Sequence, residues 1–219
     1  MASGSTEALS SQQVGRPLRL GIMGGTFDPP HLGHMLAADQ AQQALGLDRV
    51  VFMPAGTPSF KQDSCRVPAD DRLAMTRLAV RDVEGWEASD IEVVRPGITY
   101  TADTLRQLRQ TLPADARLFF IVGTDAAASM PQWKEPEAVA RLADVALVQR
   151  PGQADAREVA ESLEAAGFRV SVVPASTVDV SSSQVRQRLA EGRTVRFLVP
   201  DEVIAYIEDR GLYRSEGDA

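Results

Sequence analysis

Short apolar runs recur along the chain, and glycine or proline bounds most of them. They are rich in valine, isoleucine and phenylalanine, and they have the length of strands that are buried on both faces of a sheet. The runs that we predict to be strands are residues 19–23, 49–53, 88–94, 118–122, 145–148 and 169–173.

Between these runs, apolar residues recur at the spacing of amphipathic helices. One face begins near Gly33 and includes Leu36, Ala37, Gln40, Ala41 and Ala44; the others are Leu73, Met75, Leu78 and Ala79, then Thr104, Leu105 and Leu108, then Val159, Ala160, Leu163 and Ala166, and finally Val199, Val203, Ile204 and Ile207. Strands that alternate with helices predict an α/β fold, a Rossmann-like doubly wound parallel sheet with helices on both faces. Ligands of such sheets bind beyond the carboxyl ends of the strands.

The chain reads as one folded domain with a short tail at either end. Residues 1–17 are small, polar and aperiodic, which predicts a disordered tail or an expression remnant, and residues 215–219 are a short polar tail. We expect residues 18–214 to form a single domain, because 219 residues with 44% hydrophobic content can bury a full core. Residues 55–69 predict a long mobile loop, a feature that often serves function.

Charge and cysteine content exclude several classes of protein. The 23 basic and 30 acidic residues give a net charge of −7, which argues against sequence-independent nucleic-acid binding. No apolar run approaches the roughly 18 residues that a membrane span needs. The single cysteine, Cys65, cannot form an internal disulfide and fits a reducing, cytoplasmic compartment. We therefore expect small-molecule partners rather than nucleic acid or a membrane, and a homodimer is the one assembly that we consider.

The loop after the first strand is the strongest candidate for chemistry. Gly24 and Gly25 would let the backbone approach an anion, and the helix that follows would offer free N–H groups to phosphate oxygens. The only two histidines, His31 and His34, are three residues apart, so both rings can turn toward one point and donate to a phosphate. Alternatively, one histidine is a helix cap or a surface residue, or both ligate zinc together with Asp28.

A second phosphate loop is predicted at residues 180–186. Ser181, Ser182 and Ser183 can cap the following helix, and the same helix start can bind phosphate with help from Arg186. An ordinary capped surface helix is the alternative.

Three further positions suggest recognition of a flat, anionic ligand. Thr101 is a candidate N-cap, and the helix start there can hold a carboxylate, with an ordinary capped helix as the alternative. Gly123 and Asp125 follow a buried strand, where an aspartate can hold ribose hydroxyls. Trp133 can stack on a flat ring or fill the core.

Residues 24–34 as a whole resemble the first signature of the nucleotidyltransferase superfamily, the His-x-Gly-His of class I aminoacyl-tRNA synthetases and adenylyltransferases. The form Gly-Gly-Thr-Phe-Asp-Pro-Pro-His is similar in particular to bacterial nicotinate-nucleotide adenylyltransferases. The resemblance extends from about Arg19 to Tyr213 and implies the nucleotidyltransferase fold.

The resemblance also implies roles for individual residues. It implies His31, His34, Lys61 and Arg186 as the catalytic group; Gly24, Gly25, Thr26, Phe27, Arg150, Ser181, Ser182 and Ser183 as ATP or phosphate ligands; and Tyr100, Thr101, Gly123, Asp125 and Trp133 as ligands of nicotinate mononucleotide. The sequence departs from the family pattern at Val180, Ser183, Val185, Thr99 and Thr124, and at the two residues before Lys61, where a solvated loop lysine is the alternative.

The reaction that the resemblance implies is adenylyl transfer from ATP to nicotinate mononucleotide in NAD biosynthesis, giving nicotinate adenine dinucleotide and pyrophosphate. Mg²⁺ would be held by the substrate phosphates rather than by protein ligands. We expect nicotinate to be preferred over nicotinamide. The alternatives are a sister transferase acting on phosphopantetheine or a cytidylyl acceptor, a nucleotide sensor without catalysis, and a zinc-dependent hydrolase.

Overall fold

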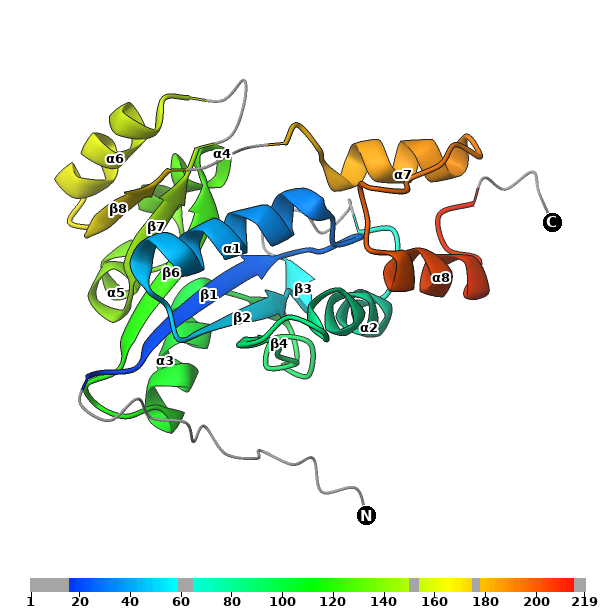
Figure 1. Ribbon diagram of the computed structural model, residues 1–219. Helices are drawn as coiled ribbons and strands as arrows, with labels where there is room; N and C mark the ends of the chain where they lie inside the picture. The colour runs from blue at the N-terminus through cyan, green and yellow to red at the C-terminus, as the bar shows by residue number, and fades with distance from the viewer. Residues whose placement is uncertain (1–15, 59–64, 150–153, 175–177, 215–219) are drawn as a thin grey trace, which may run out of the picture.

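A parallel sheet forms the centre of the computed structural model, which describes residues 16–58, 65–149, 154–174 and 178–214. The strands are β1 (Arg19–Gly25), β2 (Arg49–Pro54), β4 (Trp86–Ala88), β6 (Arg117–Gly123), β7 (Asp144–Val148) and β8 (Val170–Val173). Their order is β4-β2-β1-β6-β7-β8, and every pairing is parallel (Figure 1). The predicted doubly wound parallel sheet is therefore confirmed.

Helices cover both faces of this sheet. Buried residues of α1 (Leu32–Leu45) and α2 (Ala69–Val80) share a core cluster with one face. Those of α3 (Thr101–Thr111), α4 (Thr124–Ala127), α5 (Pro136–Leu142) and α6 (Ala156–Ala165) share a cluster with the other. The order of strands reverses between β1 and β6, and such a switch point opens a crevice at the carboxyl ends of the strands.

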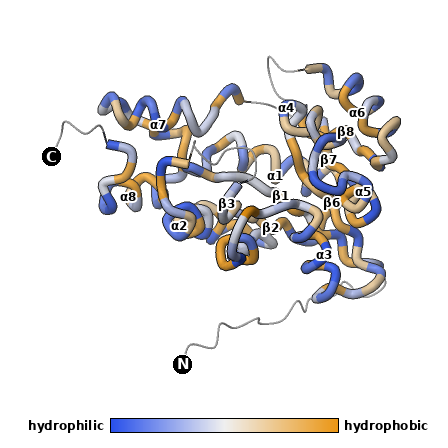
Figure 2. Tube along the Cα trace, turned by 180° about the vertical axis from the view of Figure 1, so that it is seen from behind, coloured by the Kyte–Doolittle hydropathy of each residue, from blue (hydrophilic) through white to orange (hydrophobic). Residues whose placement is uncertain are grey.

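Alternation along the strands builds the two cores. Phe119 and Ile121 of β6 face the cluster that contains α1, whereas Phe120 and Val122 face the cluster that contains α3. A strand that is buried on both faces reads as a continuous apolar run, which is why residues 118–122 were recognisable in the sequence. In Figure 2, by contrast, α3, α7 and α8 carry hydrophilic and hydrophobic residues in turn, as helices with one exposed face do.

A third cluster fastens the C-terminal helices beyond the ends of the strands. Helix α8 (Asp201–Asp209) packs against α2, and α7 (Ser182–Ala190) shares with both a cluster of buried apolar residues: Val67, Met75, Val185, Val203 and Ile207. Figure 1 shows both helices past the arrowhead of β1, where the reversal of strand order places the crevice. None of the described helices is both long and apolar enough to span a membrane.

The structure corrects the strand that was predicted at residues 88–94. Only Ala88 belongs to a strand there, and the chain turns from Ile91 onward with a bond from the Val94 N–H to the Asp90 carbonyl. Val94 is 71% exposed, so the apolar residues of this run do not face a core on both sides. The sequence also gave no sign of β3 (Thr57–Pro58) and β5 (Ile98–Thr99), which pair in a small parallel sheet, or of the 3-10 helix η2 (Met130–Gln132).

Candidate functional site

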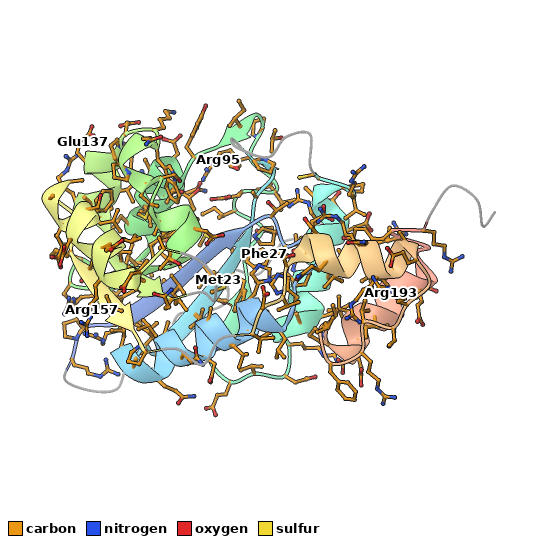
Figure 3. All side chains as sticks on the ribbon, turned by 90° about the horizontal axis from the view of Figure 1, so that it is seen from above. Met23, Phe27, Arg95, Glu137, Arg157 and Arg193 are labelled. Atoms are coloured by element: carbon orange, nitrogen blue, oxygen red, sulfur yellow. The ribbon has the colours of Figure 1, made fainter. Side chains whose placement is uncertain are left out.

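A cavity of about 720 Å³ lies at the carboxyl ends of β1 and β6, within the size range of small-molecule sites. Its walls come from the first loop, the start of α1, the start of α3 and the segment after β6; among the predicted residues they include Gly24, Gly25, Thr26, Phe27, His31, His34, Thr101, Gly123, Asp125, Trp133 and Ser182. Figure 3 shows Met23 and Phe27 near the middle of the molecule, between Glu137 and Arg157 on one side and Arg193, which follows α7, on the other. The topology thus joins segments far apart in the sequence around one cavity.

Phe27 shapes the first loop. Its backbone has a φ of 50°, which is uncommon for a residue with a side chain, and its ring is 1% exposed. The ring lies edge-on to His34 with centroids 4.9 Å apart, and a Cβ on Gly25 would come within 3.1 Å of it. The strained backbone of Phe27 therefore places an aromatic ring against His34. Backbone strain of this kind is typical of functional sites.

The two histidines do converge, as the sequence predicted. Their rings stack with centroids 3.7 Å apart and planes inclined by 28°. The backbone N–H of His31 donates to Nδ1 of His34 at 3.2 Å, which puts the ring proton of neutral His34 on Nε2. Gly33 makes this stack feasible, since a Cβ there would lie 3.1 Å from both the His31 ring and Val180.

The start of α1 differs from the prediction in one respect. We expected its free N–H groups to face phosphate, but the N–H of Leu32 donates to the Leu198 carbonyl at 2.8 Å. This bond fastens the helix start to the segment before α8, and it removes one donor from the set that an anion could use.

The second loop begins α7 with the predicted serine cap. Ser181 accepts from the backbone N–H of Gln184, whose side chain accepts from the N–H of Ser181, so the two form a capping box. Ser182 donates its hydroxyl to the Pro29 carbonyl at 3.0 Å, and Arg186 donates to the Asp28 carbonyl at 2.7 Å. The two predicted phosphate loops are thus bonded to each other.

Ser181, Ser183 and Arg186 do not line the cavity itself. Arg186 donates to Ser183 Oγ as well as to the first loop, so in this structure its guanidinium holds the loops together. The predicted contact of Arg186 with phosphate stays a prediction.

Asp28 connects the first loop to distant parts of the chain. It is 1% exposed; its carboxylate accepts from the Tyr213 hydroxyl at 2.6 Å and from the Arg66 N–H at 2.8 Å. Burial, followed by the adjacent carboxylate, raises the pKa of Tyr213, so the phenol remains a donor. The carboxylate therefore serves the loop, and no group of three histidine, cysteine or acidic side chains suited to a metal occurs in the described ranges.

Arg72 also stabilises the first loop. Although it is 1% exposed, it donates to the Thr26 carbonyl at 2.7 Å and to the Gly56 carbonyl at 2.9 Å. Sequence reasoning missed Arg72 because its partners are backbone atoms 46 and 16 positions away.

The start of α3 and the segment after β6, which pack on the other face of the sheet from α1, form another part of the cavity wall. Tyr100, not Thr101, occupies the N-cap position; Thr101 is the first helical residue and lines the cavity. The prediction was one residue late because threonine favours caps in general, whereas here the backbone turns at Tyr100. The Tyr100 ring lies outside the cavity wall beneath Lys134, with Nζ 4.2 Å from its centroid.

The segment after β6 contributes Gly123, Asp125 and Trp133 to this part of the cavity wall. Gly123 ends β6 and precedes α4, which carries Asp125. Trp133 packs edge-on to Phe120 with centroids 5.8 Å apart and donates its indole N–H to Ser129 at 2.9 Å. The tryptophan is therefore held in place, and it also borders the cavity.

Glu92 is a further acidic group in the wall that the sequence did not reveal. It is 9% exposed and accepts from the Thr104 hydroxyl at 2.7 Å. Burial raises the pKa of Glu92 above the usual glutamate value, and the threonine bond opposes that change. The apolar run at residues 88–94 concealed this carboxyl, because we interpreted the run as a strand.

Two predicted site residues, Lys61 and Arg150, lie outside the described residues, as do most of the predicted 1–17 tail, part of the 55–69 loop and residues 215–219. Their predicted roles stay predictions, and so does the division into one domain and two tails.

Comparisons with known proteins agree on the kind of chain this is. Residues 22–188 match the model of the cytidylyltransferase-like family. A protein of Dehalococcoides mccartyi is 42% identical over 91% of this chain and 98% of its own length, and one of Thermus thermophilus is 45% identical over 90% and 100%. Both are named "Probable nicotinate-nucleotide adenylyltransferase".

A solved structure also shares the fold. It is described as Plasmodium falciparum nicotinic acid mononucleotide adenylyltransferase complexed with NaAD, and it superposes with a TM-score of 0.73 over 90% of this chain and 97% of its own. The sequence identity is 18%, so this likeness concerns the fold alone.

Proposed function

The chain belongs to the nicotinate-nucleotide adenylyltransferases of the cytidylyltransferase-like family, and from this premise we propose that it transfers the adenylyl group of ATP to nicotinate mononucleotide. The products are nicotinate adenine dinucleotide and pyrophosphate. The observation that carries the proposal is one cavity whose wall contains a stacked histidine pair, the start of a helix and a tryptophan held in place by a hydrogen bond.

The chemistry needs alignment more than a base. A phosphate oxygen of the mononucleotide, already ionised at neutral pH, attacks the α-phosphorus of ATP; a new P–O bond forms as the bond to the bridging oxygen of pyrophosphate breaks. No proton has to move in this step. Positioning two anions in line and neutralising the developing charge are then the tasks of the protein.

The part of the cavity wall that contains His31 and His34 is suited to the triphosphate of ATP. Nε2–H of His34 can donate to an α-phosphate oxygen, because Nδ1 is held by the backbone of His31. Ser182 lines the cavity from the start of α7, where helix N–H groups favour phosphate. Lys61, Arg150 and Arg186 complete the proposed phosphate and adenine contacts as the family resemblance implies.

The divalent ion that ATP-dependent transferases of this kind use is Mg²⁺ in our proposal, and it enters bound to the nucleotide. We expect the cation to be held mainly by substrate phosphates and water. The ion supplies charge neutralisation at those phosphates.

The part of the cavity wall that contains Thr101 and Trp133 is suited to the pyridine ring. Trp133 offers a face for stacking, and backbone N–H groups at the start of α3 near Thr101 favour a carboxylate. A carboxylate held there distinguishes nicotinate from nicotinamide, so we expect the acid to be preferred.

The test is pyrophosphate release from ATP and Mg²⁺ with nicotinate mononucleotide, nicotinamide mononucleotide or phosphopantetheine, using the wild type and His34→Ala. Strong release with the nicotinate substrate, lost by about 100-fold or more in the variant, is the expected result. Equal rates on both mononucleotides would refute the preference, and release with phosphopantetheine instead would assign the chain to a sister activity.

A further inference from the structure

Two tyrosines near the C-terminus make the same kind of contact with different targets. The Tyr213 hydroxyl donates to Asp28 in the first loop at 2.6 Å, and the Tyr206 hydroxyl donates to Asp71 on α2 at 2.7 Å. Both aspartates are buried, with exposures of 1% and 7%. Tyr213 thus bonds directly to a loop of the cavity, whereas Tyr206 bonds to a helix, and its aspartate keeps a second donor in Arg210 at 3.2 Å.

The backbone at Tyr213 is specialised for its contact. It has a φ of 62°, a left-handed conformation that an aromatic residue adopts at a cost. This turn follows the end of α8 and brings a side chain from the C-terminal segment back to a loop 185 positions earlier. Strain of this kind persists where surrounding contacts require it.

Asp28 links Tyr213 to other residues of the site. Its second carboxylate oxygen accepts from the Arg66 N–H at 2.8 Å and lies 3.9 Å from Arg186, which itself donates to the Asp28 carbonyl. The same loop carries Phe27 and His31 on either side of Asp28. The carboxylate is therefore the point where the loop, the Arg66 segment, α7 and the C-terminal segment meet.

We propose that Tyr213 is a positioning residue for adenylyl transfer, whose hydroxyl fixes Asp28 and, through it, the first loop and Arg186. This inference rests on the proposed function. A buried carboxylate that loses one hydrogen-bond donor is destabilised unless it bonds to another donor. The Asp28 carboxylate would therefore move toward Arg186 and the Arg66 N–H, and this movement would displace the loop. A displacement of about 1 Å is sufficient to reduce rates up to about 100-fold when two reacting groups must align.

The experiment compares Tyr213→Phe with Tyr206→Phe, which removes an equivalent hydroxyl from the same region. We expect Tyr213→Phe to lower kcat/KM for ATP about tenfold, equivalent to about 1.4 kcal/mol in the barrier, with KM for nicotinate mononucleotide within about twofold of wild type. Tyr206→Phe should reduce the melting temperature by a similar amount and leave both kinetic parameters unchanged.

A double-mutant cycle with Asp28→Asn tests whether Tyr213 acts through Asp28. The amide keeps the shape without the charge, so Tyr213→Phe should cost much less in that background. Wild-type kinetics in Tyr213→Phe, an equal loss in Tyr206→Phe, or full additivity in the cycle would each overturn the proposal.

Failure of the proposed function gives a different result, namely no pyrophosphate from the wild type with nicotinate mononucleotide. In that case, calorimetric titration with a non-hydrolysable ATP analogue measures nucleotide affinity, which depends on the position of the loop and does not require catalysis. Weaker binding by Tyr213→Phe than by Tyr206→Phe would still support the positioning role, and equal affinities would refute it.

Discussion

Gly33→Ala adds one methyl group at the point where the histidine stack is tightest. The new Cβ would lie 3.1 Å from the His31 ring and 3.1 Å from a methyl group of Val180, whereas carbon atoms in contact prefer about 3.5–4.0 Å. Neither neighbour can withdraw easily. Val180 is 1% exposed, and the His31 ring already stacks on His34 at 3.7 Å.

The substitution should reduce both stability and activity. Overpacking costs about 1–3 kcal/mol, and replacing glycine by alanine in a helix returns about 0.5–1 kcal/mol. The net loss of about 0–2.5 kcal/mol would lower the melting temperature by up to about 10 °C in a chain of this size. Displacement of the stacked rings, by contrast, should reduce kcat by about 10–100-fold.

Pyrophosphate release and thermal unfolding, measured on the same preparation, test this reasoning. Val180→Ala combined with Gly33→Ala gives the added methyl group room to shift, so the double variant should recover most of the lost kcat although it is less stable. An undiminished kcat in Gly33→Ala, or no recovery in the double variant, would refute the steric explanation.

Two further predictions concern buried charged or titratable groups. Arg72→Met leaves the carbonyls of Thr26 and Gly56 without donors; it should lower the free energy of unfolding by about 2–4 kcal/mol in urea denaturation and reduce the stabilisation by ATP, and an unchanged midpoint would contradict this. Because burial raises the pKa of Glu92, the folded state holds that proton more tightly than the unfolded state, and the resulting stability is lost as the pH rises from 4.5 through the raised value. Wild type should therefore lose stability relative to Glu92→Gln over that window in denaturation curves, and parallel pH profiles would refute the assignment.

Local pattern was sufficient for β1, β2, β6, β7 and β8, for most helices and for the two loops that carry the histidines and serines. Each of these features depends on neighbours in the sequence: apolar runs bounded by glycine, or a capping residue three positions before its partner. The strand predicted at residues 88–94 failed for the same reason. Local hydrophobicity does not reveal that Val94 lies at the surface or that the Glu92 carboxyl meets a threonine on α3.

The site residues that the sequence did not reveal are joined by contacts across long separations. Asp28 stands inside the recognised loop, but its partners Arg66 and Tyr213 are 38 and 185 positions away. Bonds of this kind depend on the completed fold, and a tyrosine near the end of a chain has no periodic or motif signal of its own.

The buried charges around the first loop also explain how an acidic protein can attract two anions. No described carboxylate lies within ion-pairing distance of Arg72, so its charge is offset mainly by the two carbonyls that it meets. A buried cation without an ionic partner is costly to the unliganded protein. Arg72 does not line the cavity, so its charge acts on an incoming phosphate only over a distance, and that field favours ATP even though the net charge is −7. The melting temperature should consequently rise on addition of ATP in wild type by more than in Arg72→Met.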